Sequence, residues 1–348
     1  MTQPIPKTIA VFRTDRIGEV LLSTVAVDIL RKAYPASSII FFTSKYSAAL
    51  LHNRKDINEV IPLDIFQRRH WVGDALRLAR MLKSRRCGMS IVLNPSKTVH
   101  LACFFARVRR RCGFDRKWGS LLTDRVNDCR NDGKQHEVEY TKEFFRALGI
   151  PAADEVRPSL VVANKMKELV RLRLQERGVD LRKQLVIVHP CASNPLKCWP
   201  RQKYIELSRQ LGSLSVQLVL IGEQKEYDEL ADMVCECGCH VLNGAGLFDL
   251  EELAAVINIS DLFIGNDSGP MHMAAALGVP VIAIFSKKAT GSNPLRWRPW
   301  GEGHAIFHEL YGEKPCQLKH FSGYYIAKDE IEPSDVLKLS CVYLNERL

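Results

Sequence analysis

The sequence predicts an α/β protein built from two doubly wound domains in series. Short β-rich runs alternate with helical stretches along most of the chain, which is the pattern of strand–helix–strand units in a parallel sheet. The alternation stops at a connector near residue 151 and restarts at about residue 184. At 348 residues the chain is also longer than one ordinary hydrophobic core requires. We therefore expect an N-terminal domain over residues 1–165 and a C-terminal domain over residues 166–348, with the two domains facing a cleft.

The N-terminal domain begins with the strand TIAVFRTD, and a helix is predicted to follow it from about Ile17 to Lys32. The helix HEVEYTKEFFRALG closes the domain, because Gly149 and Pro151 stop it. The remaining predicted elements are helical stretches after the second and fourth strands, a helix from about His70 to Lys83, and the strands SIIFFTS, INEVIPL, MSIVLN and a short one near CGF.

The C-terminal domain follows a connector and an amphipathic helix, KMKELVRLRLQERG. Helices are predicted from about Pro200, through the 220s, and after Asp249, which has Glu252 three residues later as its capping-box partner. The predicted strands are LVIVHP, VQLVLIG, HVLNGAG, DLFIGND and VPVIAIF, and the last two are expected to be the final strands of the sheet. Ligands of such sheets bind beyond the carboxyl ends of the strands.

The composition excludes several classes of protein. Hydrophobic residues make up 46% of the chain, which is typical of a globular protein rather than a disordered one. No apolar run reaches the 18 residues of a membrane-spanning helix, and the N-terminus lacks the pattern of a signal peptide. The eleven cysteines lie mostly in apolar segments, where free thiols act as small hydrophobic groups. We therefore expect a cytoplasmic protein.

One cysteine cluster, CECGCH at residues 235–240, has the side chains of a metal site but not the usual spacing. Zinc ligands commonly follow a C-x2-C pattern with a second pair far along the chain, whereas here the spacing is C-x-C-x-C. A chance run at a loop is the favoured interpretation, and we expect neither a bound metal nor a cofactor.

The positive charge of the chain is concentrated in its N-terminal part. Residues 1–160 contain 28 Lys and Arg against 16 Asp and Glu, a net charge of +12, whereas the remainder carries −2. The densest basic run comprises Arg107, Arg109, Arg110, Arg111, Arg116 and Lys117. An excess confined to one half indicates an anionic partner that this half meets, although a basic run can also be a solvated face.

The stretch FIGNDSGPMHMAAA at residues 263–276 places polar residues at a strand-to-helix junction in the C-terminal half. One interpretation is a tight turn with a capped helix, in which Pro270 occupies the first helical turn. The alternative is a nucleotide site, in which amides near Ser268 and Gly269 bind phosphate and Asp267 accepts hydrogen bonds from sugar hydroxyls. His272, one turn into the helix, either donates to a diphosphate or packs in the core.

A second loop, HPCASNPLKCWP, lies at the end of the strand LVIVHP. Lys197 is its single cation, and beside an anion site we expect it to contact phosphate. Ser193 in this loop is a further candidate for a contact with the nucleotide sugar. Glu223, just after the next strand, is either a ribose ligand or an ordinary surface acid.

Several common nucleotide motifs are missing from the sequence. There is no G-x-x-x-x-G-K-[ST] phosphate loop, no G-x-G-x-x-G after a strand, and no D-x-D pair to hold a nucleotide's metal. RRM, KH and helix-turn-helix signatures are missing as well, so a nucleic-acid partner ranks last despite the pI of about 9.1.

The loop after the first strand, FRTDRIGEVLLS, contributes the candidate general base. Gly18 permits a tight turn, and Glu19 opens the next helix. A Glu at this position stabilises the helix dipole, and it can equally serve as a general base in an interdomain cleft.

Three blocks of the chain resemble glycosyltransferase family 9, the ADP-heptose:lipopolysaccharide heptosyltransferases. They are RTDRIGEVLLSTVAVDILRKAYP, the K-x-W-P of LKCWP, and NDSGPMHMAAALGVPVIAIFS with RWRPW after it. The resemblance covers nearly the whole chain. It implies a GT-B fold of two Rossmann-like domains, with the donor in the C-terminal domain, the acceptor in the N-terminal domain, inversion at the anomeric carbon and no bound metal.

The resemblance also assigns expected roles to individual residues. Asp267, Ser268, Gly269 and His272 correspond to the nucleotide-heptose site, and Lys197 corresponds to the diphosphate-binding lysine. Glu19 falls where the family usually has Asp, the expected catalytic base. Because Glu is one methylene longer, its carboxylate must be re-aimed by about 1 Å, an error that can cost heavily in rate.

The expected function is transfer of heptose from ADP-heptose to the inner core of lipopolysaccharide, with Kdo–lipid A or a heptosylated core as acceptor. This acceptor is anionic and lies on a membrane, so we expect peripheral contact with the cytoplasmic face of the inner membrane. The expected acceptor-binding residues are Arg16, Arg107, Arg109, Arg110 and Arg111, followed by Arg68 and Arg69. The alternatives are a transferase of another nucleotide sugar and a non-catalytic nucleotide-sugar binder.

Overall fold

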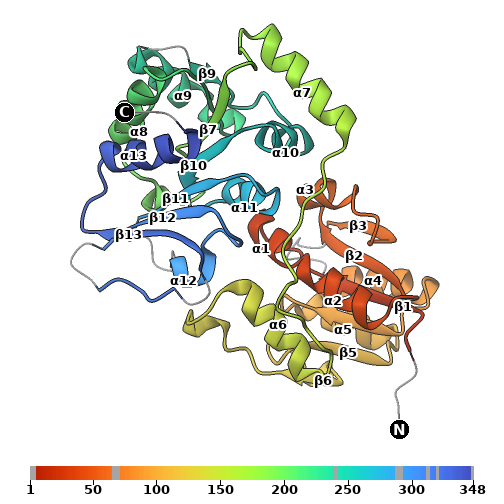
Figure 1. Ribbon diagram of the computed structural model, residues 1–348. Helices are drawn as coiled ribbons and strands as arrows, with labels where there is room; N and C mark the ends of the chain where they lie inside the picture. The colour runs from red at the N-terminus through yellow and green to blue at the C-terminus, as the bar shows by residue number, and fades with distance from the viewer. Residues whose placement is uncertain are drawn as a thin grey trace. The chain divides into compact units, whose positions relative to one another are not determined.

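The computed structural model describes residues 5–64, 71–238, 241–286, 293–310, 314–318 and 321–345. The chain divides into two compact units, residues 1–161 and residues 162–348, and each unit has its own parallel sheet. The division falls four residues before the boundary expected from the sequence. Figure 1 labels the elements of both units.

The sheet of the first unit has six parallel strands in the order β3-β2-β1-β4-β5-β6. The strands are β1 (Thr8–Phe12), β2 (Ser38–Ser44), β3 (Glu59–Leu63), β4 (Met89–Val92), β5 (Arg110–Phe114) and β6 (Asp124–Val126). All five expected strands are present, and β6 is an additional short edge strand. The order reverses between β1 and β4, because successive strands add on one side of β1 and then on the other.

Helices cover both faces of this sheet (Figure 1). They are α1 (Ile17–Leu22), α2 (Val25–Ala33), α3 (Lys45–Ala48), α4 (Trp71–Ser84), α5 (Lys97–Phe105) and α6 (Glu137–Ala147). On one face α2 packs against α6. On the other, α4 and α5 pack against one another over a layer of apolar side chains that includes Phe12 and Phe42.

The single helix expected from Ile17 to Lys32 is divided into α1 and α2 at Ser23 and Thr24. The Thr24 hydroxyl donates to the carbonyl of Leu21 at 2.7 Å and accepts from the amide of Ser159 at 3.1 Å. Such a side-chain bond to the backbone competes with regular helix geometry, and periodicity alone does not reveal it.

The sheet of the second unit has seven parallel strands in the order β13-β12-β11-β10-β7-β8-β9. The strands are β7 (Gln184–His189), β8 (Val216–Leu220), β9 (Val241–Asn243), β10 (Leu262–Asn266), β11 (Val281–Phe285), β12 (His304–Glu309) and β13 (Gly323–Lys328). The helices are α7 (Asn164–Glu176), α8 (Arg201–Gly212), α9 (Tyr227–Cys237), α10 (Leu250–Asn258), α11 (Gly269–Ala276), α12 (Pro294–Trp297) and α13 (Pro333–Leu344).

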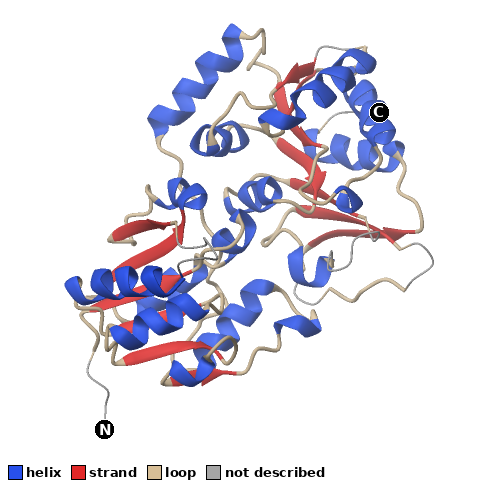
Figure 2. Cartoon of the chain, turned by 180° about the vertical axis from the view of Figure 1, so that it is seen from behind, coloured by secondary structure: helices blue, strands red, loops and turns tan. Residues whose placement is uncertain are grey.

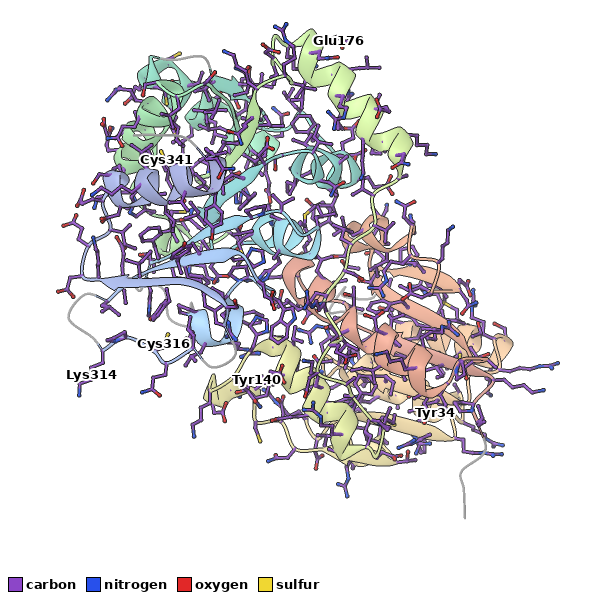
Figure 3. The ribbon with its side chains drawn as sticks, in the orientation of Figure 1. Tyr34, Tyr140, Glu176, Lys314, Cys316 and Cys341 are labelled. Carbon is purple, nitrogen blue, oxygen red and sulfur yellow. The ribbon has the colours of Figure 1, made fainter. Side chains whose placement is uncertain are left out.

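The expectation that VPVIAIF forms the last strand was wrong, because β12 and β13 extend the sheet beyond β11. Although β12 is buried, its sequence HAIFHE ends in groups that usually face water. Its His308 Nδ1 lies 2.9 Å from the Tyr325 hydroxyl of β13. That hydroxyl also accepts from the backbone amide of Cys316 at 3.2 Å, and Cys316 is labelled in Figure 3. These tertiary bonds satisfy polar groups that, in the sequence alone, weaken the strand signal.

Gly265 shows how closely the central strands of this unit approach. A Cβ at this position in β10 would lie 2.9 Å from the backbone oxygen of His189 in β7. Such a contact forces the backbone to shift, so glycine lets β10 pair with β7 at full register. The ends of these two strands carry the candidate site described next.

Candidate functional site

In the second unit, most of the candidate residues lie where β7 and β10 end side by side. The strand order reverses between these neighbours, because β8 and β9 add beyond β7 whereas β11 to β13 add beyond β10. In open α/β sheets such a reversal leaves a crevice at the carboxyl ends of the strands, where ligands bind. The loop from Pro190 to Pro200 follows β7, and Asp267 and Ser268 follow β10.

Asn266, the last residue of β10, joins these two loops and is completely buried. Its Oδ1 accepts from the amide of Trp199 and from the hydroxyl of Tyr204, both at 2.9 Å. Its Nδ2 donates to the carbonyl of Pro190 at 2.8 Å. Because buried polar groups must be paired, one amide side chain fixes both ends of the lysine-bearing loop against β10.

Lys197 and Asp267 form an ion pair across the two loops. The Lys197 Nζ donates to the Asp267 Oδ2 at 2.5 Å, and the Asp267 side chain is 6% exposed. Lys197 is the last residue of a short 3-10 helix, Pro195–Lys197, which Asn194 caps by accepting from the amide of Leu196 at 3.1 Å. The structure thus brings together the lysine that is expected to bind phosphate and the aspartate that is expected to accept hydrogen bonds from sugar hydroxyls.

Ser268 precedes α11, but its hydroxyl does not cap that helix. It lies 3.0 Å from Nδ1 of His189 at the end of β7. Burial lowers the pKa of His189 to about 4, so the imidazole is neutral at neutral pH and can either accept from or donate to the hydroxyl. A neutral imidazole that donates to Ser268 leaves the serine proton free for a ligand oxygen.

Helix α11 begins at Gly269 and has Pro270 in its first turn. Backbone amides of a first turn have no acceptor within the helix, so those of Gly269 and Met271 are suited to an anion. The side chain of His272 is buried and its ring lies 6.5 Å from the ring of Trp297, edge to face. The role of His272 toward a diphosphate stays a prediction.

The two remaining candidates of this unit are at the surface. Ser193 is an exposed residue of the loop after β7. Glu223 precedes a short 3-10 helix, Gln224–Glu226, and its carboxylate lies 2.6 Å from Nζ of Lys225. Neither residue shares a hydrogen bond with the Lys197–Asp267 pair in the described contacts, and their roles in donor binding stay predictions.

In the first unit, the reversal of strand order lies between β1 and β4, and polar residues again follow both strands. The Asn94 side chain, two residues beyond β4, accepts from the amide of Thr14 at 3.3 Å and donates to its hydroxyl at 3.1 Å. The buried Arg13 donates to Asp15 at 2.8 Å and to the buried Glu137 of α6 at 3.2 Å. This network holds the loop that leads to Glu19.

Glu19 lies in the first turn of α1, directly after this loop, and is half-buried. Burial raises the pKa of its carboxyl group, and the negative charge of Asp15 raises it further, while Arg13 opposes both effects. A carboxylate with a raised pKa is a stronger proton acceptor, which is the property that a general base requires.

The expected acceptor-binding arginines are not gathered at one edge of this sheet. Arg16 precedes α1 directly, at the carboxyl side of the sheet and three residues before Glu19, and its side chain makes no capping hydrogen bond. Arg110 begins β5 and is in register with Met89, which begins β4, so it lies at the amino edge. Its side chain bonds Asp124 at 3.0 Å, Leu148 O at 2.8 Å and the hydroxyl of Tyr34, labelled in Figure 3, at 3.4 Å.

Arg111 follows Arg110 at that amino edge, and its guanidinium donates to the carbonyls of Leu121 and Val108, each at 2.7 Å. Arg109 precedes β5 and is exposed. Arg68 and Arg69 lie outside the described residues. A direct role of these arginines in holding the acceptor stays a prediction.

Sequence reasoning missed four residues that build the two sites: Arg13, Asn94, His189 and Asn266. Each lies at, or within two residues of, the carboxyl end of a strand beside a reversal of order. An explicit prediction of strand order could have found them, because the reversal selects β1 and β4 in one unit and β7 and β10 in the other.

Within the described parts of the chain, no group of three or more His, Cys, Asp or Glu residues is arranged to hold a metal ion. Cys239 and His240 of the CECGCH cluster lie outside those parts. In the same described ranges, none of the helices combines the length and the apolarity needed to cross a membrane.

Comparison with known proteins places the chain among sugar transferases. The sequence profile of glycosyltransferase family 9 (heptosyltransferase) matches residues 75–322. Lipopolysaccharide heptosyltransferase 2 of Salmonella typhimurium is 28% identical over 92% of this chain and 94% of its own. Among solved structures, a family 9 glycosyltransferase of Veillonella parvula superposes with a TM-score of 0.85 at 20% identity, covering 100% of this chain and 99% of its own.

The Escherichia coli ADP-heptose LPS heptosyltransferase II superposes with a TM-score of 0.75 at 23% identity, covering 97% of this chain and 98% of its own. These likenesses and the two parallel α/β units confirm the predicted GT-B fold class. The match of the family profile over more than half of the sequence shows that the chain belongs to glycosyltransferase family 9, the heptosyltransferases.

Proposed function

We propose that this enzyme transfers heptose from ADP-heptose to the inner core of lipopolysaccharide, either Kdo–lipid A or a core that already carries heptose. The names of its relatives support this choice, since the Salmonella typhimurium protein is a lipopolysaccharide heptosyltransferase. The structurally similar Escherichia coli protein is named for ADP-heptose. The second unit would bind the donor, and the first unit would bind the acceptor.

The observation that carries the proposal is the Lys197–Asp267 pair beside Ser268 and the start of α11. A nucleotide sugar presents a diphosphate flanked by two sugars that are rich in hydroxyl groups. The cation and the amides of α11 suit the diphosphate, whereas the carboxylate suits a hydroxyl. All these groups meet at one reversal of strand order, where a ligand is expected.

The proposed reaction is a single displacement at the anomeric carbon. An acceptor hydroxyl oxygen forms the new bond to that carbon, while the bond from the carbon to the diphosphate oxygen breaks. Glu19 accepts the hydroxyl proton, and the leaving ADP takes the bonding electrons. Attack from the face opposite the leaving group inverts the anomeric configuration, and the transition state has oxocarbenium character.

Stabilisation of the leaving diphosphate is assigned to the protein itself. Lys197, which ends the 3-10 helix, and the amides of Gly269 and Met271 at the start of α11 would stabilise the negative charge that grows on the diphosphate. Fixed donors of this kind need little reorganisation during the reaction, which is why such sites lower barriers effectively. The mechanism therefore uses no metal ion.

The place of action that we propose is the cytoplasmic face of the inner membrane, where the enzyme would be bound peripherally. The acceptor's lipid anchor requires the reacting sugar to be reached from a membrane surface. The strong positive charge of the first 160 residues supports this placement, because lipid A and the surrounding phospholipids are anionic.

A screen of nucleotide sugars by thermal shift, followed by turnover assays, tests the proposal. ADP-heptose at 100 times its dissociation constant should add about 2.7 kcal/mol to the free energy of unfolding. Stabilisation by a different nucleotide sugar, together with its turnover, would assign another donor. Stabilisation without turnover on any core acceptor would identify a non-catalytic binder instead.

A further inference from the structure

One face of the first unit combines exposed apolar side chains with cations. It is the outer side of α4 and α5, which pack side by side on one face of the sheet. Figure 2 shows the chain from the side opposite to that of Figure 1. Val72 and Leu76 of α4 are 44% and 42% exposed, and Phe104 and Phe105 of α5 are 46% and 39% exposed. We refer to this surface as the α4–α5 face.

The charge of the chain is concentrated in the segment that forms this face. Residues 71–118 contain twelve Lys and Arg but two acidic residues, Asp74 and Asp115. The segment therefore carries +10, as much as the whole chain. The Asp74 side chain is buried and its carboxylate accepts from Arg77 at 2.8 Å, so it contributes little negative potential to the surface.

Helix α4 carries this character as a stripe along one side. Val72, Leu76, Arg80 and Lys83 are spaced by four, four and three residues, which places them on one face of the helix. All four are exposed, whereas the residues on the opposite side, such as Leu78 and Leu82, belong to the core. The solvent-facing side of α4 therefore combines aliphatic side chains with cations, whereas the solvent-facing side of an ordinary amphipathic helix is polar.

A groove continues the stripe at the end of α5. Its volume is about 580 Å³, and it is lined by Lys83, Phe104, Phe105, Arg107, Val108, Arg109 and Arg111. Every charged side chain in this lining is a cation. The Arg111 guanidinium lies 5.8 Å from the centroid of the Phe104 ring, which holds the ring beside the charge.

The far end of the face carries an exposed tryptophan. Trp118 packs edge to face on Trp71, with ring centroids 5.3 Å apart, and the ammonium of Lys97 lies 5.7 Å from its ring. Tryptophan is enriched at the interface between lipid headgroups and acyl chains, and a lysine can extend its ammonium group to the headgroups there.

We propose that the α4–α5 face docks on an anionic phospholipid bilayer, with its cations at the headgroup phosphates and its exposed apolar side chains in the headgroup–acyl boundary. Charge complementarity selects an anionic partner, and the aliphatic Val72 and Leu76 select one with an apolar interior. A nucleic acid offers phosphates and bases that stack on aromatic rings, but it offers no environment for the aliphatic residues.

Docking through this face would hold the enzyme against the membrane that carries the acceptor. This biological purpose rests on the proposed function. Docking also gives the arginines near β5 a role away from the reacting sugar. Arg109 and Arg111 line the groove, and Arg110 begins β5 beside them, so all three lie at the amino edge, whereas Glu19 lies at the carboxyl side of the sheet.

Co-sedimentation of the full chain with vesicles tests the proposal. The vesicles are phosphatidylcholine alone and phosphatidylcholine mixed with phosphatidylglycerol, and no substrate is present. We expect binding to the mixed vesicles only. Arg80→Gln/Lys83→Gln should weaken it roughly tenfold to thirtyfold, because each cation near an anionic surface contributes about fivefold. Leu76→Ser/Phe104→Ser should weaken it about tenfold by removing inserted apolar area.

Matched controls come from α7 of the second unit and from Arg177, which directly follows it; this segment also exposes cations and leucines. Lys165→Gln/Arg177→Gln removes the same charge, and Leu169→Ser/Leu172→Ser removes similar apolar area. Both controls should bind like the parent chain. Equal losses in the controls and in the α4–α5 variants would overturn the proposal.

Two further outcomes distinguish the partner and the function. If a random oligonucleotide binds with the affinity of the mixed vesicles and Leu76→Ser/Phe104→Ser leaves vesicle binding unchanged, the face binds polyanions and the proposal fails. Transfer to a lipid-free core fragment tests the activity separately. All four variants should retain it, and its absence from the parent chain would contradict the proposed function while leaving membrane docking standing.

Discussion

The ammonium of Lys197 donates to the carboxylate of Asp267 at 2.5 Å, so the cation expected to bind phosphate already has an acidic partner. The pair holds the lysine at the end of β10 and beside the start of α11. It also couples the two expected ligand contacts, because a change in either side chain alters the charge that the other one faces.

Replacement of the two partners should therefore have opposite effects on ADP. Lys197→Ala removes a charge-assisted bond and leaves a buried carboxylate near the diphosphate, so ADP binding should weaken by roughly 1.5–3 kcal/mol. Asp267→Asn removes the competing charge, so ADP should bind as tightly as before or more tightly. Calorimetric titration measures both, and equal weakening in the two variants would disprove the assignment.

His189 makes the second unit sensitive to acid. Its pKa is about 4 in the folded protein because of burial, against about 6.5 for an ordinary histidine. The unfolded chain thus binds more protons below pH 6.5, and this residue alone costs roughly 3 kcal/mol of stability as the pH falls to 4. His304, whose pKa is also lowered to about 4 by burial, acts in the same direction.

His189→Gln should remove about half of the acid-induced loss of stability that His189 and His304 cause together. Denaturant unfolding between pH 4 and neutrality gives the free energy of unfolding of both proteins. An unchanged pH slope in the variant would mean that His189 titrates normally. In the same variant, a double-mutant cycle with Ser268→Ala on ADP affinity should show strong coupling, because the imidazole acts through the serine hydroxyl.

Glu19 should limit stability while supporting turnover. The pKa of its carboxyl group is raised in the folded state by burial and by Asp15, so folding favours the protonated form. The protonated carboxyl group therefore stabilises the folded protein at low pH, and this contribution is lost as the pH rises through the pKa of the folded state. Glu19→Gln should therefore increase the free energy of unfolding at neutral pH but not below the pKa of an unfolded glutamate.

The same variant should lower turnover by roughly 100-fold or more with donor affinity nearly intact. The kcat/KM of the parent enzyme should rise with pH as the carboxyl group loses its proton. A variant that is both fully active and no more stable would leave Glu19 as a residue that merely stabilises the helix dipole.

Asn266 should contribute strongly to the stability of the second unit. Asn266→Ala leaves the amide of Trp199, the hydroxyl of Tyr204 and the carbonyl of Pro190 without their buried partner. Each unmet group costs about 1–3 kcal/mol, so a loss of roughly 3 kcal/mol or more is expected. Asn243→Ala removes two bonds near the surface and should cost far less. Similar losses in chemical unfolding would show that the buried network is unimportant.

The sequence was most informative where periodicity and strand ends carry the signal. Alternation of apolar runs predicted the strands of both units up to β11 except the short edge strand β6, and the position of Lys197 and Asp267 after two strands predicted that they belong to one site. Long-range bonds were not predictable in this way. The break at Thr24 depends on Ser159, and β13 depends on bonds to His308 and Cys316, so local pattern gave no indication of either.

Roles that depend on burial were equally hidden in the sequence. His189 has no local feature that separates it from a surface histidine, yet burial beside Ser268 makes it neutral. Arg110 lies in a basic run, but its guanidinium is engaged by Asp124 and Leu148, far apart in sequence. Charge counts identified the basic region correctly without distinguishing which of its cations face solvent.

Product analysis tests the central claim most directly. The enzyme is incubated with ADP-heptose and Kdo–lipid A, or with a heptosylated core, in the presence of EDTA, and the acceptor is examined by mass spectrometry and NMR. The account predicts that the acceptor gains the mass of a heptose residue, that an equal amount of ADP is released, and that the new bond has the anomeric configuration opposite to that of the donor. An acceptor left unchanged by ADP-heptose, a requirement for added divalent metal, or a retained anomeric configuration would contradict it.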